Sequence, residues 1–536
     1  MSQNILVNEI GYLPMDPKRA VYRGEGTMEF SVIDRKTGEK VYEGVTGREI
    51  ICSAAGEKNR IIIFDGVVEE GEYIIKAGGE ESVPFVIKEW VYSDAMKALL
   101  KFFYLQRCGQ KLPEEIAGEF AHEPCHDTNA RIYGTDRFID VSGGWHDAGD
   151  FGRYIVPAAV TIGHLFLAME LDPNLIKFDF GIPVENPDLG QLLSEIKYET
   201  DWMLKMQNPE TGEVYHKVTC TRFCDFFMPE EEKDELVVSP VSYAATLDFA
   251  ASLAMAVRFF KPVDAEYADI LADASKKAYE AAKKMEVKGF HNPEGIVTGE
   301  YGDESLEDEL YWASAELYRT FGEEEYRKTF EEMAYKHISH GYGWEDVYSF
   351  GNVAYILSEF PVDETLKGII IAAIDAKADS LLYLCKSNGY NISFNEKSFI
   401  WGSNMYLMQN AFHLYTAYFF TKKDDYLEAA KEHTHYILGK NPCNVCFLTG
   451  FGTNRVLNPH HRPSAAKKKP MPGMVVGGPD SGLHDPTAEK YLKGQPSAKC
   501  YVDELLSYST NEITLYWNSA MVVMLALFVE GYRELK

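Results

Sequence analysis

The stretch Gly143-Gly144-Trp145-His146-Asp147-Ala148-Gly149-Asp150 places two carboxylates three residues apart on a segment too rich in glycine for the interior of a helix or strand. Its glycines permit backbone angles that other residues avoid, so this loop can present both acids on one concave edge. Two nearby carboxylates can hold and polarise one water molecule, with one of them accepting its proton. The alternative interpretation is an ordinary polar surface turn, and the rest of the chain has to decide between the two.

Apolar residues at helical spacing surround this loop and continue to the end of the chain. From about Trp90 onward, twelve segments carry apolar residues at i, i+3, i+4 and i+7, the pattern of a helix with one buried face. The segments fall near 92–109, 153–171, 188–207, 239–260, 264–286, 304–321, 323–338, 347–359, 363–386, 402–420, 424–438 and 511–533. Twelve helices without intervening strands predict a toroid of six inner and six outer helices. In such a toroid the loops at one end form a cleft, and the long loops here are 110–152, 208–238, 287–303 and 439–510.

Residues 1 to about 88 show a different pattern, with short runs rich in β-branched and aromatic residues. The runs are 20–22, 28–33, 60–64, 71–76 and 83–87, and turn residues such as Lys36-Thr37-Gly38 separate them. Several short strands at this spacing predict a small β-sandwich. We therefore expect a mainly α-helical protein with two domains, a sandwich at 1–89 and a helical barrel at 90–536.

The chain is strongly acidic. Its 536 residues include 53 lysines and arginines against 82 aspartates and glutamates, which gives a net charge of −29. Phosphate backbones and anionic lipid surfaces repel such a chain, so we expect neither a nucleic-acid partner nor a membrane partner. No apolar run reaches about 18 residues, the length that a membrane-spanning helix needs, so the sequence predicts no such helix.

The N-terminus favours a cytoplasmic location, and this location decides how the cysteines are interpreted. Residues 1–7 lack a basic segment followed by an apolar core, so we expect no secretory signal unless one was removed. The nine cysteines are then expected to be thiols or metal ligands rather than a disulfide framework. Aromatic residues make up 13% of the chain, which suits a carbohydrate cleft because sugar rings offer apolar faces, although a large core accounts for most of them.

Four potential metal ligands lie in the loop-rich segment around the opening stretch: Cys108, Cys125, His126 and His146. Two thiolates and two imidazoles form a closed tetrahedral site of the kind that structural zinc occupies. Such a metal ion would fix His146, and with it the angle at which the two neighbouring aspartates leave the loop. The alternative is a pair of buried thiols and two ordinary histidines.

The last long loop and the segment after it carry further polar residues. His460 and Arg462 lie among prolines, so they are rigid donors that can grip sugar hydroxyls, although they can equally brace the loop. Glu512 is expected at the start of a largely apolar helix, where desolvation raises the pKa of a carboxyl group and favours a proton donor. The alternative is that Glu512 merely complements the helix dipole.

Over nearly its whole length the chain resembles glycoside hydrolase family 9, and three motifs carry the resemblance. The stretch at 143–150 matches the family's loop with the catalytic aspartates. Gly452-x-Asn454-x4-Pro459-His460-x-Arg462 matches its histidine signature, and Tyr501-x-Asp503-x4-Tyr508-x3-Glu512-x-Thr514-x3-Asn518 matches its acid signature. One departure is Cys446, where the histidine signature usually begins with Ser, Thr or Val, but that position is structural.

The resemblance implies an (α/α)6 catalytic barrel behind an N-terminal immunoglobulin-like domain and an inverting hydrolysis of β-1,4-glucan. It implies that Asp150 is the general base, that Asp147 helps to hold the attacking water, and that Glu512 is the general acid. His460 and Arg462 would contact the sugar at the cleavage point, and Tyr508 would pack beneath it. An inverting enzyme leaves room for the water, so we expect the carboxyl groups of Glu512 and Asp150 to stand roughly 6.5–9.5 Å apart.

The resemblance also bears on metals. Members with this kind of sandwich domain bind zinc through a Cys, Cys-His and His set, which supports the four ligands named above. Calcium is frequent in the family, and one acidic cluster is placed like such a site: Asp303, Asp308, Glu309 and Asp346. A solvated helix start explains these acids nearly as well.

No carbohydrate-binding module and no Ser/Thr/Pro-rich linker is visible in the sequence. Insoluble cellulose is out of reach of a protein that is not exported, so the expected substrates are cello-oligosaccharides and soluble β-glucans, and the expected activity is that of a cellodextrinase or endoglucanase. The alternative within the enzyme class is an exo-acting β-glucosidase or β-glucosaminidase. The alternative from another class is a non-catalytic glucan-binding protein.

Overall fold

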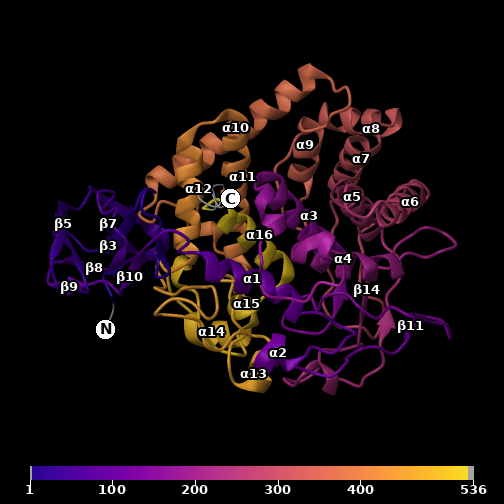
Figure 1. Ribbon diagram of the computed structural model, residues 1–536, viewed down its shortest axis with the longest axis horizontal. Coiled ribbons are helices and arrows are strands. Elements are labelled where there is room, and N and C mark those ends of the chain that lie inside the picture. Colours follow the sequence, from indigo (N-terminus) through magenta and orange to yellow (C-terminus); the bar gives the residue numbers. More distant parts are fainter. Residues whose placement is uncertain (1–2, 529–536) are drawn as a thin grey trace.

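The computed structural model describes residues 3–528, with a small β-rich part and a large helical part (Figure 1). Two sheets make up the N-terminal part. One has the order β1-β3-β7-β6, with strands Ile5–Leu6, Arg19–Arg23, Glu57–Ile63 and Glu49–Cys52. The other has the order β2-β10-β8-β4-β5, with strands Gly11–Tyr12, Phe85–Ile87, Gly71–Ala77, Glu29–Asp34 and Lys40–Val45, and with β9 (Glu80–Glu81) beside β8. The predicted sandwich is confirmed.

Alternation along the strands builds the sandwich core. In β8, Tyr73, Ile75 and Ala77 are buried while Glu72 and Lys76 are exposed, the period-2 pattern of a half-buried strand. The strands β3, β4, β7, β8 and β10 coincide with predicted runs, whereas β5 has no fully buried residue and therefore lacks the apolar signal that the prediction relied on.

Twelve long helices form the barrel within the described residues. Their bounds are α1 Ser93–Leu105, α3 Ile155–Leu171, α4 Gly190–Lys205, α5 Tyr243–Phe260, α6 Ala265–Ala282, α7 Glu307–Phe321, α8 Glu324–Ala334, α9 Tyr348–Ile356, α10 Glu364–Ser387, α11 Ser403–Thr421, α12 Asp424–Ile437 and α16 Leu515–Ala526. Short helices lie in the loops: α2 Glu114–Ala117, α13 Arg462–Lys467, α14 Pro486–Leu492 and α15 Tyr508–Asn511.

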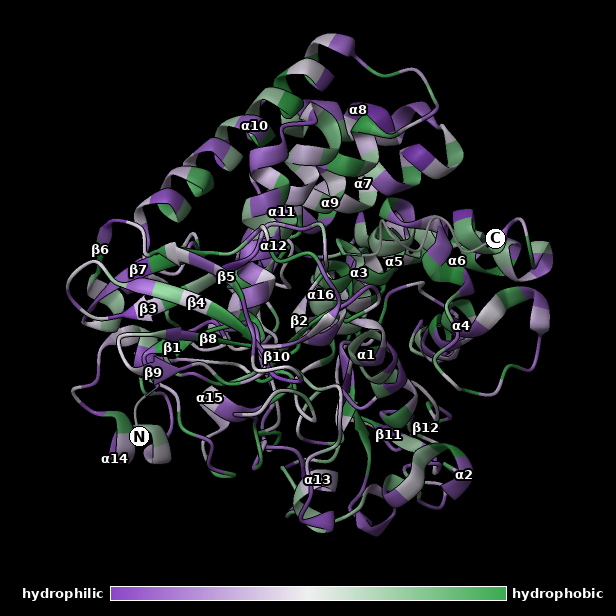
Figure 2. Ribbon diagram, turned by 60° about the vertical axis from the view of Figure 1, so that its left-hand side comes forward, coloured by the Kyte–Doolittle hydropathy of each residue, from purple (hydrophilic) through white to green (hydrophobic). Residues whose placement is uncertain are grey.

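The inner and outer helices differ in burial. Every residue of the inner helix α16 is buried, whereas the outer helix α8 buries only the stripe Tyr326, Phe330 and Ala334. The inner helices are α3, α5, α7, α9, α11 and α16, and the outer helices α1, α4, α6, α8, α10 and α12 pack against them. The outer helix α10 accordingly alternates hydrophilic and hydrophobic bands (Figure 2). The predicted (α/α)6 barrel is confirmed.

Two details of the prediction were wrong. The last helix begins at Leu515 rather than at 511, because Thr514 caps it by accepting a hydrogen bond from the Trp517 N–H at 3.3 Å; the predicted end at 533 lies outside the described residues. The helical region also contains strands, since the loops form a sheet of order β12-β11-β15-β14-β13. Its strands are Phe138–Ile139, Ala130–Ile132, Val237–Val238, Lys217–Thr219 and Arg153–Tyr154, each too short to show a period-2 pattern.

Helix α5 is long and apolar enough to cross a membrane by length and composition, with a mean hydropathy of 1.2 over its 18 residues. However, 89% of that window is buried inside the protein. Burial among other helices is what the barrel architecture requires of an inner helix, so this apolar segment is explained by the fold.

The sandwich and the barrel share an apolar interface. Leu6, Val21, Cys52, Ala54 and Ala55 belong to the same buried cluster as the barrel helices. This contact is the kind expected of a domain that braces its neighbour, although the division of the chain between residues 89 and 90 stays a prediction.

Glu9 adds a polar connection between the two parts. Its Oε2 accepts hydrogen bonds from the main-chain N–H groups of Thr453 and Asn454, both at 2.7 Å, and its Oε1 accepts from Asn454 Nδ2 at 3.0 Å. Burial raises the pKa of Glu9, although these three bonds lower it. The N-terminal part thereby fixes the start of the loop that leads to His460.

We predict that Glu9→Gln lowers the melting temperature by a few degrees and also reduces kcat. Each hydrogen bond to a charged group is worth about 1.5–3 kcal/mol. In the glutamine variant, an NH2 group, which is a donor, replaces one of the two carboxylate oxygens that accept these bonds. Differential scanning calorimetry measures the first effect, and an assay of the hydrolysis expected from the resemblance measures the second. Glu25→Gln is the matched control, because Glu25 is exposed and its ion pair with Lys58 contributes little. Equal behaviour of the two variants would contradict the bracing role.

Candidate active site

Buried carboxylates and a buried arginine hold the loop 143–150 in place. Glu199 Oε2 accepts from the Trp145 main-chain N–H at 2.6 Å, and Glu195 Oε1 accepts from the indole Nε1 of the same tryptophan at 2.7 Å. On the other side, Arg153 Nη1 donates to the carbonyl of Gly143 at 2.7 Å. Helix α4 therefore positions this loop through the hydrogen bonds that Glu195 and Glu199 accept from Trp145.

Gly149 is the point at which the two distant parts of the site meet. A Cβ at this position would lie 2.1 Å from the His460 carbonyl oxygen and 3.2 Å from Glu512 Oε1, so only glycine permits the approach. Arg462 Nη1 donates to the Gly149 carbonyl at 2.7 Å, and the backbones of His460 and Glu512 pair as a parallel bridge.

Asp147, Asp150 and Glu512 line one cleft with a volume of about 610 Å³. The rest of its wall is largely aromatic or polar, including Tyr154, Phe223, Tyr301, Trp344, Trp401, Tyr406, Gln409, Tyr516 and Trp517. The structure thus brings together the three acids that the sequence predicted. The volume and the aromatic walls of this cleft are typical of a site for a small ligand.

The two aspartates each receive a hydrogen bond from a tyrosine hydroxyl. Tyr301 donates to Asp147 Oδ2 at 2.5 Å, and Tyr154 donates to Asp150 Oδ2 at 3.3 Å. Asp147 is 1% exposed, and burial raises its pKa well above the usual range although the Tyr301 hydroxyl lowers it. Tyr301 has a backbone φ of 49°, a left-handed conformation that side chains rarely adopt outside functional or strained positions.

Glu512 lies between α15 and α16 in an extended conformation, with φ −73° and ψ 162°, and not in the first turn of a helix as predicted. Burial, together with the negative charge of Asp150, raises the pKa of Glu512 to about 8, while the nearby Arg462 lowers it. The carboxyl group is therefore protonated at neutral pH. The predicted effect on the pKa is present, but it comes from burial in the cleft wall and not from an apolar helix.

His460, Arg462 and Tyr508 make different contacts near the cleft. His460 donates from Nδ1 to the Leu505 carbonyl at 2.7 Å. Arg462 is 5% exposed and uses its guanidinium on the main-chain carbonyls of Cys224 and Gly149, as a loop brace would. The Tyr508 ring packs 5.4 Å from that of Trp401, which lines the cleft. Contact of these three residues with a sugar stays a prediction.

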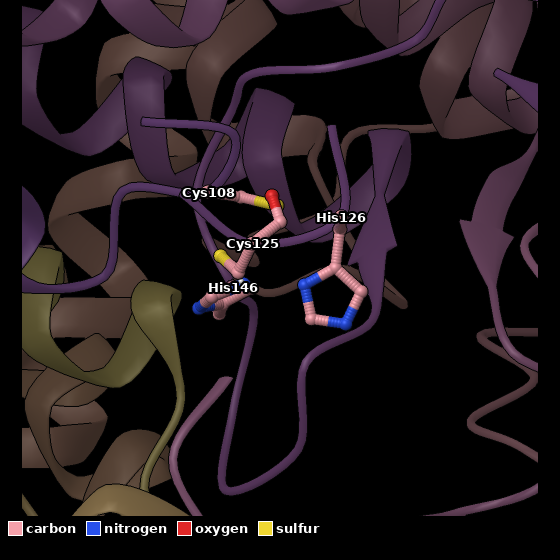
Figure 3. Close-up of side chains that lie close together, drawn as sticks. All are labelled: Cys108, Cys125, His126 and His146. Carbon is pink, nitrogen blue, oxygen red and sulfur yellow. Dashed lines mark hydrogen bonds between the residues drawn. The ribbon is translucent and has the colours of Figure 1, made fainter. Parts of the chain in front are cut away.

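Cys108, Cys125, His126 and His146 come together as predicted (Figure 3). Their ligand atoms all lie within 4.8 Å of one another, and all four residues are buried. His126 Nε2 bonds to Glu232 Oε2 at 2.9 Å, while its Nδ1 is buried without a partner. A histidine that is held by a carboxylate through one nitrogen and keeps the other free is typical of a metal ligand, so the four residues fit a metal ion.

Comparison with known proteins now identifies the family. The pattern of "Glycosyl hydrolase family 9" matches residues 92–525, and that of "Cellulase N-terminal ig-like domain" matches residues 1–82. The chain belongs to glycosyl hydrolase family 9. This family member is therefore an enzyme that hydrolyses glycosidic bonds, which removes a non-catalytic binding protein from the alternatives.

Similar proteins cover the whole length of this family 9 enzyme. A cellodextrinase from Butyrivibrio fibrisolvens is 38% identical over 98% of this chain and 100% of its own. The structure of AaCel9A in complex with cellobiose-like isofagomine has a TM-score of 0.94 at 36% identity, covering 98% of this chain and 100% of that one. A Zn-binding triple mutant of the family 9 endoglucanase J30 has a TM-score of 0.92 at 33% identity, covering 97% and 99%.

Three of the four predicted calcium ligands, Asp303, Asp308 and Glu309, lie near an acid that the sequence analysis missed. Asp248, on α5, is fully buried and neither of its oxygens has a hydrogen-bond partner, and its pKa is raised well above the usual range by burial and by Asp308 and Asp303. Asp303 Oδ2, Asp308 Oδ1 and both oxygens of Glu309 are also buried without partners. Unpartnered buried carboxylate oxygens can bind a divalent cation, whereas a solvated helix start would expose them. Within residues 3–528, however, only the Cys and His cluster brings three or more ligand atoms within 4.8 Å of one another.

Sequence reasoning missed the tyrosines that bond the aspartates as well as Asp248. Tyr301 stands next to Gly302 in the long loop 287–303, and an aromatic residue beside glycine in a long loop was the available signal. Asp248 is a single acid inside the apolar helix Tyr243–Phe260, where an unpaired charge is costly unless something binds it.

Proposed function

We propose that this family 9 enzyme cleaves β-1,4-glucosidic bonds of cello-oligosaccharides and short soluble β-glucans by a single displacement. Glu512 protonates the leaving oxygen, while Asp150 takes a proton from a water molecule on the opposite face of the sugar ring and Asp147 helps to hold that water. The observation that carries this proposal is the meeting of these three acids in one cleft, with the pKa of Glu512 raised to about 8.

A preference for short substrates is part of the proposal. The similarity to a cellodextrinase over the full length of both chains favours it, as does the complex of AaCel9A with a cellobiose-like inhibitor. Aromatic cleft residues such as Trp344 and Trp401 offer apolar faces to successive sugar rings.

We also propose a cytoplasmic location for the enzyme, because short soluble substrates can be taken up by the cell. Cell fractionation tests this proposal.

We predict that labelled cellohexaose is cut internally, with cellotriose, cellobiose and cellotetraose as early products, and that each new reducing end appears first as the α-anomer. Inversion at a β-linkage gives the α-anomer because water attacks from the face opposite the leaving group. Chromatography follows the products and proton NMR follows the anomers. Release of glucose together with cellopentaose as the first products would support the exo-acting alternative, and a first-formed β-anomer would reject the single displacement.

We predict that Glu512→Gln and Asp150→Asn each lower kcat by at least about a hundredfold while leaving the fold intact, since removal of a general acid or base commonly costs 10²–10⁴-fold. In the wild type, kcat/KM should fall as the pH rises through about 8, because the acid must be protonated and the pKa of Glu512 is raised to about 8. Assays across pH and circular dichroism test both statements. Near-normal activity in either variant would remove that residue from its role.

We propose that the cluster of Cys108, Cys125, His126 and His146 holds zinc. Two sulfur and two nitrogen donors in a buried group are the ligand set of structural zinc, and the J30 triple mutant that binds zinc is a structural neighbour. A metal ion held there would tie α1 and the segment before β11 to the loop that carries Asp147. It would act on the reaction only through the position of that loop.

We propose that Asp303, Asp308, Glu309 and Asp346, together with Asp248, hold a calcium ion. Hard oxygen donors suit calcium, which also takes main-chain carbonyls and waters. The ion would neutralise acids whose mutual repulsion and burial otherwise raise their pKa, that of Asp308 to about 7. Helices α5 and α7 would thereby be connected to the segment before α9, whose Asp346 lines the cleft.

We predict that the purified enzyme contains about one zinc and at least one calcium by elemental mass spectrometry, and that Cys125→Ser loses the zinc while Asp248→Asn loses calcium. Each variant should melt several degrees lower, because a metal ion that binds only the folded state stabilises it. Cys385→Ser is the matched control, since Cys385 is a buried thiol of α10 outside the cluster. Unchanged metal content in Cys125→Ser or Asp248→Asn would reject the corresponding site.

A further inference from the structure

Four aromatic side chains form a row that leads outward from the segment of Glu512. The row begins at His460, whose backbone pairs with that of Glu512 and whose ring lies 6.0 Å from the ring of Tyr508. The Tyr508 ring lies 5.4 Å from that of Trp401, and the Trp401 ring lies 6.0 Å from that of His484. Trp401 lines the cleft, and His484 stands one ring beyond it. His484 is therefore the outer end of the row.

The two outer side chains of this row are open to solvent. Trp401 is 41% exposed, and the side chain of His484 is 51% exposed. Their ring planes are inclined by 29°. An indole that can pack on the apolar face of a sugar and an imidazole that can bond a hydroxyl group thus stand next to each other at the cleft.

Asp480 fixes the direction of the imidazole of His484. This aspartate is fully buried and accepts hydrogen bonds from the main-chain N–H groups of Gly482 at 2.9 Å and of His484 at 3.1 Å. Its carboxylate also bonds His484 Nδ1 at 2.8 Å, and because a carboxylate only accepts, Nδ1 carries a proton. Nε2 has no hydrogen-bond partner within residues 3–528, so it is the nitrogen that is left for a ligand.

A second buried carboxylate, that of Asp485, attaches the loop of His484 to the segment of Tyr508. Asp485 Oδ2 accepts from Ser507 Oγ at 3.0 Å, from the Ser509 N–H at 3.0 Å and from Ser509 Oγ at 2.7 Å. Tyr508 lies between these two serines, and its hydroxyl donates to the His484 carbonyl at 3.2 Å. The imidazole therefore has a fixed position relative to the rest of the row.

We propose that His484 is a substrate-binding residue that forms, together with Trp401, a sugar subsite at the outer end of the cleft. The indole packs on the apolar face of a glucose unit, and Nε2 of His484 bonds one of its hydroxyl groups. This subsite holds a part of the chain that the three acids do not touch, so it contributes to the binding of long substrates and leaves the chemical step unchanged. The inference rests on the proposed cleavage of cello-oligosaccharides.

The test compares His484→Ala and His484→Phe with the wild type on cellohexaose and on cellotriose. Both variants remove the bond from Nε2, and His484→Phe keeps a ring beside Trp401. KM for cellohexaose should rise about threefold in His484→Phe and about tenfold in His484→Ala, the range that one hydrogen bond contributes. The kcat values and the KM for cellotriose should change little, because the shorter chain is held at the acids without reaching this subsite.

Tyr491→Ala is the matched control, because Tyr491 is a 50% exposed aromatic residue of α14 in the same loop, and its hydroxyl bonds Lys490 at 3.1 Å. It should leave both KM values unchanged. An unchanged KM for cellohexaose in His484→Ala would overturn the proposal. An equal rise for cellotriose and cellohexaose would overturn it as well, since that result places the effect at the cleavage point.

Isothermal titration calorimetry in the Asp150→Asn background separates this inference from the proposed function. Adding His484→Ala should weaken the binding of cellohexaose about tenfold and that of cellotriose little. If the wild type hydrolyses neither oligosaccharide, the proposed function fails and this inference with it. If the wild type hydrolyses cellohexaose and the titration shows no loss of affinity in His484→Ala, this inference alone fails.

Discussion

The active site depends on one close main-chain contact, that of Gly149 with the segment around His460. No side chain fits between them, and the Arg462 guanidinium closes the contact by bonding the Gly149 carbonyl. Through it the loop with both aspartates, which follows α1, touches the strand-like segment that carries Glu512 just before α16. The barrel makes this possible because its first and last helices are neighbours in the ring, where α16 packs against α1 and α3. The closure of the ring therefore brings the two ends of the catalytic part together, and the glycine sets the final distance.

Buried polar groups from three separate parts of the molecule lie on the two segments that meet at Gly149. Glu195 and Glu199 of α4 hold Trp145 by hydrogen bonds, and Glu9 of the sandwich holds the loop that leads to His460. The Cys and His cluster meets the same loop as Trp145 at His146. All of these groups are buried and polar, so each is costly to leave unpartnered and each favours one arrangement of the loops. The apolar helices supply the stability that offsets this cost, whereas the polar groups determine where the acids stand.

The sequence predicts the framework of this protein better than its site. Helical periodicity located all twelve barrel helices because each has a continuous apolar face, and the spacing of Cys108, Cys125, His126 and His146 located their cluster. Strands of two or three residues such as β13 and β14 escaped, since they are held by neighbours distant in sequence and show no pattern of their own. The conformation of Glu512 was mispredicted for the same reason: its pairing with His460 overrides the helical tendency of the residues that follow. Tyr301, His484 and Asp248 were missed because their importance comes from partners that only the folded chain supplies.

Two groups of buried acids in this barrel differ in their hydrogen-bond donors, and the donors determine which chemistry each carboxyl group suits. In the cleft, the aspartates receive hydrogen bonds from Tyr301 and Tyr154, and Glu512 can carry its own proton, so protons and hydroxyl groups satisfy much of the charge. Around Asp248, both oxygens of Asp248 and of Glu309 are buried without a hydrogen-bond partner within residues 3–528. Asp303, Asp308 and Asp346 each accept one main-chain N–H. A set of acids with its own donors is suited to moving protons, because each state is stabilised in turn. Buried carboxylate oxygens without donors, such as those of Asp248 and Glu309, are suited to holding a cation, because an added positive charge satisfies them.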